Sequence, residues 1–164
     1  MVDLVEIQTA YYMMAATGVL VAATYYIFNM RQSTKNRKAQ LFMGIYDKWI
    51  APEAIDGHIR IRRLKIDSFT EFYELYENSE SVEGRHIIWT AVYFEGLGVL
   101  VKEGLIDVRL VALFLHGEVK LFWEKYGPFL KEQRVVENYP RAWIEAEYLY
   151  NRIIDYGRRH LQQG

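Results

Sequence analysis

The side chains best suited to chemistry in this sequence are a few carboxylates and histidines. Glu83 and His86 stand three residues apart, a spacing that places both side chains on one face of a helix. Carboxylate-bridged di-iron bundles need two such Glu-x-x-His pairs and two further carboxylates. No other histidine has a glutamate three residues before it. We therefore interpret the pair as the solvated start of a helix, and the sequence predicts no metal site.

Glu95 is the most notable acid because its neighbours Tyr93, Phe94, Leu97 and Val99 are apolar or aromatic. Burial would raise the pKa of its carboxyl group and suit it to general acid or base catalysis. Catalysis also needs a positioned partner, and the sequence nominates none. A hydrogen-bonded structural carboxylate is the favoured interpretation. The alternative is a membrane-tethered enzyme or ligand sensor that uses the bundle interior around Glu95.

Two glycines, Gly96 and Gly98, could begin a phosphate-binding loop, but such loops follow a strand. These glycines lie inside a helical pattern, which favours close packing against a neighbouring helix. The chain also lacks cysteine, which excludes disulfides, thiolate ligands and thiol nucleophiles. We accordingly expect no cofactor and no enzyme activity.

The elements that position these residues begin with a stretch free of charge, from Ile7 to Met30. As a helix it would span roughly 36 Å, enough to cross a hydrocarbon core of about 30 Å. A buried core helix or a helix lying on the membrane surface would need a polar face, which this stretch lacks. A signal peptide would begin with basic residues, whereas acids precede this stretch. The sequence therefore predicts one transmembrane helix. Residues 1–40 form the anchor with its basic juxtamembrane segment, and residues 41–164 form the second domain.

The charges beside this span predict its orientation. Only the acids Asp3 and Glu6 precede it, whereas the cations Arg31, Lys35, Arg37 and Lys38 follow it. Positive charge is retained in the cytoplasm, so the N-terminus is expected outside the cell membrane and the C-terminal domain in the cytoplasm. The same four cations are expected to contact anionic lipid.

Small residues recur along one face of the span. Ala15, Gly18 and Ala22 are separated by three and four residues, and the last two have a small-xxx-small spacing. Small side chains allow helix backbones to approach closely in lipid. This face is either a helix-packing surface or part of a plain lipid-facing anchor.

The remaining chain is expected to be a small helical bundle, so that the fold class is all-α. Pro52 ends the first helix or opens the next, and the following basic segment is partly strand-like in its alternation. Helices are expected to start after Ser68, Ser81 and Asp107 and to stop at Gly104. The helix after Asp107 is expected to reach Tyr126. Pro128 and Pro140 are each expected to open a further helix, and the last should contain Trp143.

Two segments carry the most specific pattern in this bundle, Tyr93–Asp107 and Phe122–Tyr126. With the final aromatic helix and the single span, they resemble a family of uncharacterised prokaryotic membrane-anchored helical proteins, a domain of unknown function. The resemblance covers roughly residues 41 to 157. It implies the architecture just described and supplies no active site.

A basic segment and an acidic segment stand next to each other in the bundle. The basic segment, from His58 to Lys65, includes Arg60, Arg62 and Arg63. The acidic segment, from Asp67 to Glu83, includes Glu71, Glu74 and Glu77. The two segments either pair with each other or form a docking surface for a charged partner. The formal net charge of −1 argues against nucleic-acid binding, which usually needs a basic excess.

These patterns together predict a noncatalytic, membrane-anchored interaction protein. Its expected role is that of an accessory or scaffolding subunit in a larger membrane protein complex. Its expected partners are membrane lipid and other membrane protein subunits or further copies of itself.

Overall fold

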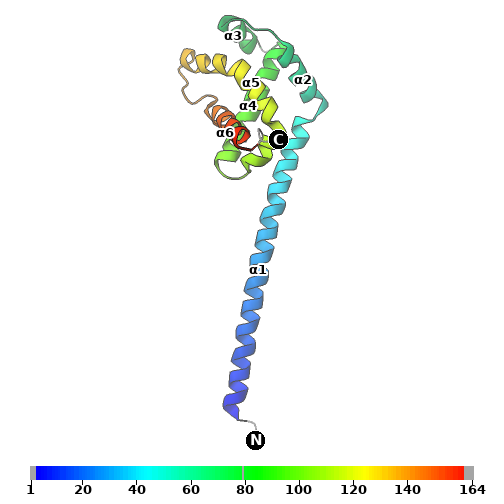
Figure 1. Cartoon of the computed structure of the whole chain (residues 1–164), viewed down its shortest axis with the longest axis vertical. Coiled ribbons are helices and arrows are strands. Elements are labelled where there is room, and N and C mark those ends of the chain that lie inside the picture. Colours follow the sequence, from blue (N-terminus) through cyan, green and yellow to red (C-terminus); the bar gives the residue numbers. More distant parts are fainter. Residues whose placement is uncertain (1–2, 79, 161–164) are drawn as a thin grey trace. The chain divides into compact units, whose positions relative to one another are not determined.

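A computed structural model of the protein describes residues 3–78 and 80–160, and all their regular structure is helical. This part of the chain forms six helices, labelled in Figure 1: α1 (Leu4–Trp49), α2 (Pro52–Arg63), α3 (Phe69–Glu77), α4 (Val82–Lys102), α5 (Val108–Val136) and α6 (Ile144–His160). The predicted all-α class and the long apolar N-terminal helix are therefore confirmed.

The chain divides into two compact units, one ending at Met43 and the other beginning at Gly44. The first unit consists of most of α1. Among the described residues, α1 is the only helix long and apolar enough to cross a membrane. None of its apolar stretch is buried. The hydroxyl groups of Thr9, Thr17 and Thr24 each donate to the backbone carbonyl four residues earlier, which satisfies them within the helix itself.

The second unit is a helical bundle in which α6 packs against both α4 and α5, while α2 and α3 pack against α4 (Figure 1). Its core consists of fully buried apolar side chains from these helices: Phe72, Ile87, Phe94, Leu115, Leu130, Leu149 and Ile153. Burial of such side chains contributes about 1.5–3 kcal/mol each to stability. This core fixes the positions of α4 and α5, and the buried Ile61 side chain holds α2 against them. These three helices carry the candidate site.

The predicted helix boundaries at four residues are confirmed. The Ser68 hydroxyl accepts from the backbone N–H of Glu71 at 3.2 Å, and the Ser81 hydroxyl accepts from that of Gly84 at 3.0 Å. The Asp107 carboxylate accepts from the N–H of Arg109 at 2.8 Å. Gly104, with φ +66°, lies just after α4, where the left-handed conformation favours glycine.

The basic segment, whose local structure the sequence left open, is helical and belongs to α2. Its arginines lie on the exposed side, while Ala54, His58 and Ile61 are buried. Two other local predictions are wrong. The helix after Asp107 continues past Tyr126 through Pro128 to Val136. Proline cannot donate to the carbonyl four residues earlier, but the burial of neighbouring side chains on both sides holds the helical path.

The last helix also begins later than predicted. Pro140 lies in a turn, and α6 starts at Ile144. Trp143 precedes it with φ 60°, outside the helical region. The turn is held by Arg134, whose guanidinium donates to the carbonyls of Ala142 and Trp143 and to the carboxylate of Glu147. These side-chain bonds from α5 decide where α6 begins.

Candidate functional site

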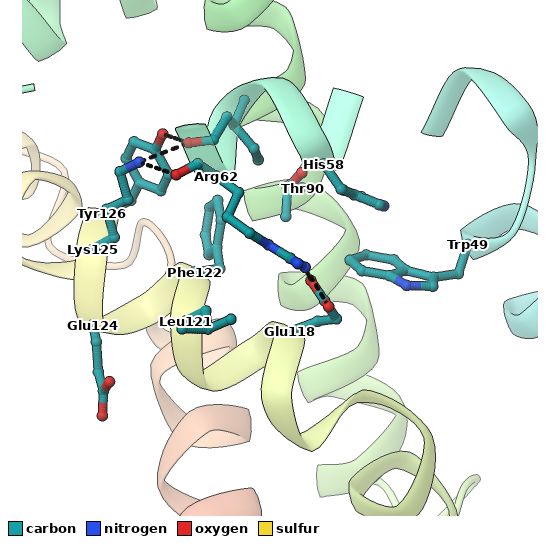
Figure 2. Close-up of a pocket in the computed structure, with 11 residues that line it drawn as sticks. Trp49, His58, Arg62, Thr90, Glu118, Leu121, Phe122, Glu124, Lys125 and Tyr126 are labelled. Carbon is teal, nitrogen blue, oxygen red and sulfur yellow. Dashed lines mark hydrogen bonds and ion pairs between the residues drawn. The ribbon is translucent and has the colours of Figure 1, made fainter. Parts of the chain in front are cut away.

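A cavity of about 320 Å³ opens among α2, α4 and α5 in the second unit. Figure 2 shows the side chains around it, with Trp49, the last residue of α1, on one wall. Ligand pockets in proteins usually measure about 300–1,000 Å³, so this cavity is of the size that holds a small molecule. Its lining residues are Trp49, His58, Ile61, Arg62, Thr90, Glu118, Leu121, Phe122, Glu124, Lys125 and Tyr126.

The upper wall is the C-terminal end of α2, held against α5 by two side chains. The ammonium group of Lys125 donates to the carbonyls of Ile61 at 2.8 Å and Arg62 at 2.9 Å (Figure 2). It also donates to the carbonyl of Leu64. The Tyr126 hydroxyl donates to the same Ile61 carbonyl at 2.5 Å. The last carbonyls of a helix lack donors within the helix, and a cation there favours the helix dipole. Burial lowers the pKa of Lys125.

The rim carries an ion pair between α2 and α5. The guanidinium of Arg62 donates through one nitrogen to both carboxylate oxygens of Glu118, at 2.5 and 2.6 Å. Figure 2 shows the Arg62 side chain extended past the Phe122 ring to reach this carboxylate. The side chains of Arg62 and Glu118 are 52% and 34% exposed, so water can solvate either group if the pair separates. The pair is therefore exchangeable.

His58 is a buried polar residue of the cavity wall. It is 8% exposed, and its ring stacks on Trp49 with 3.8 Å between the ring centroids. Burial is the main cause that lowers its pKa to about 4, against an opposing effect of the Glu118 carboxylate. The imidazole is therefore neutral at pH 7. Its buried Nε2 has no hydrogen-bond partner among the described residues.

Next to His58 in the sequence, Gly57 allows α2 to approach α4 closely. A Cβ on Gly57 would overlap the imidazole of His86 and lie 2.6 Å from its Cγ. On the cavity wall, the Thr90 hydroxyl donates to the carbonyl of His86 at 2.8 Å. The Thr90 hydroxyl is therefore bonded within its own helix.

Glu95, the acid favoured from the sequence, lies outside this cavity. Its carboxylate accepts from the backbone N–H of Ala146 at 2.7 Å, in the first turn of α6. Such N–H groups have no partner within their own helix, so Glu95 caps α6 from a different helix. Burial is the main cause that raises its pKa, and the hydrogen bonds oppose it. This geometry supports the interpretation of Glu95 as a structural carboxylate.

The two glycines beside Glu95 differ. A Cβ on Gly98 would overlap the backbone oxygen of Glu145 and lie 2.5 Å from its carbonyl carbon, whereas nothing lies within 4 Å of a Cβ on Gly96. The prediction of close helix packing is therefore confirmed at Gly98, between α4 and α6. The same prediction is wrong for Gly96, which faces open space.

The charged segments predicted as pairing or docking surfaces contact each other little in the described part of the chain. One ion pair joins them, between Arg60 and Glu83 at 3.8 Å. Arg62 binds Glu118 on α5, and Glu71 accepts from the backbone N–H of Asp67 at 3.1 Å. The remaining predicted docking residues are exposed: Arg63, Glu74 and Glu77.

The residues predicted to act in or near the membrane all lie on α1 in the first unit and are exposed. The small residues are Ala15, Gly18 and Ala22, and the cations are Arg31, Lys35, Arg37 and Lys38. Nothing lies within 4 Å of a Cβ on Gly18. The small-residue face is thus available for packing.

The cavity itself was not predicted from the sequence. His58 and Arg62 are four residues apart, which places them on one face of α2, but the same spacing occurs on many helices. Glu118 comes from a helix more than fifty positions later, and no local pattern links it to Arg62. Phe122 and Tyr126, which line the cavity, are also buried members of the core.

Comparisons with known proteins give one result. The family model of a domain of unknown function (DUF4760) matches residues 13–153, which is most of the chain. No curated protein and no solved structure matches the sequence. The resemblance to an uncharacterised family is thereby confirmed.

Proposed function

This chain belongs to the DUF4760 family, a domain of unknown function, and we propose that it is a noncatalytic, membrane-anchored interaction protein. In this proposal it serves as an accessory or scaffolding subunit of a larger membrane protein complex. One observation carries the proposal: the apolar part of α1 is long enough to span a bilayer and has no buried residue. An exposed apolar surface of this extent is unfavourable in water and favourable in lipid.

The orientation proposed for the anchor places the bundle in the cytoplasm and α1 in the cell membrane. It is supported by the exposed cations after the span, Arg31, Lys35, Arg37 and Lys38, each of which gains about 1 kcal/mol near an anionic lipid surface. We expect a protease added outside intact cells to leave the bundle undigested, as judged by immunoblotting with an antibody against the C-terminal helix. If the bundle is digested as fully in intact cells as in permeabilised cells, it lies outside the cell and the proposed orientation is wrong.

The second part of the proposal is that α1 contacts another membrane helix, from another subunit or a second copy. It is supported by the open face that contains Ala15, Gly18 and Ala22. Replacing Gly18 and Ala22 with leucine should obstruct backbone approach and leave membrane insertion intact, because hydrophobicity rises. Helix contacts in lipid are often worth about 1 kcal/mol, so we expect about a fivefold loss of co-purifying partner at matched expression.

The matched control is Thr17→Leu with Thr24→Leu, which adds bulk on the opposite side of the same exposed span. It should insert equally well and retain the partner. If the variant at Gly18 and Ala22 retains as much partner as this control, α1 is a passive anchor. Partner binding would then be assigned to the exposed charges of the bundle.

A further inference from the structure

We propose that the cavity beside Arg62 binds a small planar aromatic molecule that carries a carboxylate. This inference is independent of the membrane role proposed above, because every lining residue belongs to the second unit. It assigns a ligand-binding site to the bundle. The argument rests on three features of the cavity: its aromatic walls, its charges and its buried histidine.

The walls of the cavity favour a flat ring. Trp49, Phe122 and Tyr126 contribute aromatic side chains, and Ile61 and Leu121 contribute aliphatic ones. Aromatic rings interact favourably with other rings at offset-stacked or edge-on geometry. At about 30 Å³ for each water, the volume equals that of about ten water molecules, which is room for a compound of one or two rings.

The charges of the cavity favour an anion. Four charged residues line it, but Figure 2 shows the Glu124 carboxylate directed away from Arg62 and Trp49. Arg62, Lys125 and Glu118 remain, which is an excess of one positive charge. Lys125 is committed to the carbonyls of α2. Arg62 is therefore the group that can bind a carboxylate, for which a guanidinium offers several donors.

Binding requires an exchange of partners at the rim. The ligand carboxylate would replace Glu118 on the guanidinium of Arg62, and the released Glu118 would be solvated because its side chain is 34% exposed. The exchange conserves the number of charge-assisted hydrogen bonds to Arg62. Removing the competing carboxylate of Glu118 should therefore strengthen anion binding.

His58 gives the site a polar group in addition to Arg62. Its Nε2 is buried and has no partner among the described residues, which is unfavourable in the ligand-free protein. The site thus combines aromatic walls, an exchangeable arginine and an unsatisfied buried nitrogen, which together distinguish it from a packing defect.

The test uses the full-length protein in lipid nanodiscs and two probes, indole-3-acetate and its uncharged amide, indole-3-acetamide. Isothermal titration calorimetry should show that indole-3-acetate binds at least about tenfold more tightly, because the amide forms no charge-assisted bonds with Arg62. Arg62→Gln should abolish this difference. Glu118→Gln should instead tighten binding of the acetate by about tenfold, since the competing carboxylate is gone.

A matched pair of tryptophan substitutions separates the cavity from nonspecific binding. Leu121 and Leu113 are both half-exposed on α5, but only Leu121 lines the cavity. Leu121→Trp should fill the cavity and abolish binding, and Leu113→Trp should bind as the unmodified protein does. The proposal is overturned if indole-3-acetate does not bind at millimolar concentration, if both probes bind equally, or if Leu121→Trp leaves binding unchanged.

Discussion

Replacing Gly98 with alanine should destabilise the bundle by about 2 kcal/mol or more. The added methyl group would overlap the backbone oxygen of Glu145, and backbone cannot move aside as a flexible side chain can. Relief would require α6 to shift away from α4. That shift would weaken the hydrogen bond from the Ala146 N–H to Glu95 and the ion pair of Lys102 with Glu145, both of which cross the same contact.

The measurement is urea unfolding of the full-length protein in mild detergent, followed by tryptophan fluorescence. All four tryptophans lie in the second unit, so the signal reports on the bundle. Gly96→Ala is the matched control, two residues away on the same helix with nothing within 4 Å of the new methyl group. Helix propensity predicts that this control is more stable by up to about 1 kcal/mol. Equal midpoints for the two variants would show that α4 and α6 do not approach as described.

Much of the fold could be predicted because its signals are local. A capping side chain bonds to an N–H two or three residues away, as Ser68, Ser81 and Asp107 do, so sequence spacing alone reveals it. The apolar stretch of α1 is similarly continuous in sequence. These features need no knowledge of tertiary contacts.

The errors arose where tertiary contacts override local preference. Pro128 is a strong local signal for a helix end, but burial of the residues around it keeps α5 continuous. The start of α6 depends on Arg134 and Glu95, which lie on other helices. Neither contact can be predicted from the residues around Pro140, so the start of α6 was placed too early.

The candidate site was unpredictable for the same reason. Its rim pair joins Arg62 to Glu118, and its wall joins Lys125 to the end of α2. Each contact brings together residues far apart in the sequence. Arg62 was recognised as charged and exposed, and only the structure identifies Glu118 as its partner. Trp49 and His58 were similarly separate in the sequence and are stacked in the fold.

The second large effect concerns acid stability and depends on His58. Burial lowers the pKa of His58 from 6.5 to about 4 in the folded protein. The unfolded chain therefore binds a proton near pH 6.5 that the folded protein does not accept until about pH 4. The stability that follows from keeping His58 neutral is fully present above pH 6.5 and is lost as the pH falls toward 4. Between about pH 7 and pH 5, linkage predicts a loss of about 2 kcal/mol.

His58→Phe should remove this loss, because phenylalanine retains a ring against Trp49 and cannot be protonated. The free energy of unfolding would be measured for both proteins at pH 7 and pH 5. The pH dependence of the native protein should exceed that of the variant by about 2 kcal/mol. Burial raises the pKa of Glu95, which makes folding more favourable as the pH falls, but Glu95 is present in both proteins and its effect cancels in the comparison.

The control is His160→Phe, at an exposed position near the end of α6. This variant leaves the burial of His58 unchanged, so it should lose as much stability in mild acid as the native protein does. If His58→Phe loses the same amount as His160→Phe, the imidazole of His58 is accessible to protons in the folded state. The stacking on Trp49 would then be too loose to hold His58 neutral.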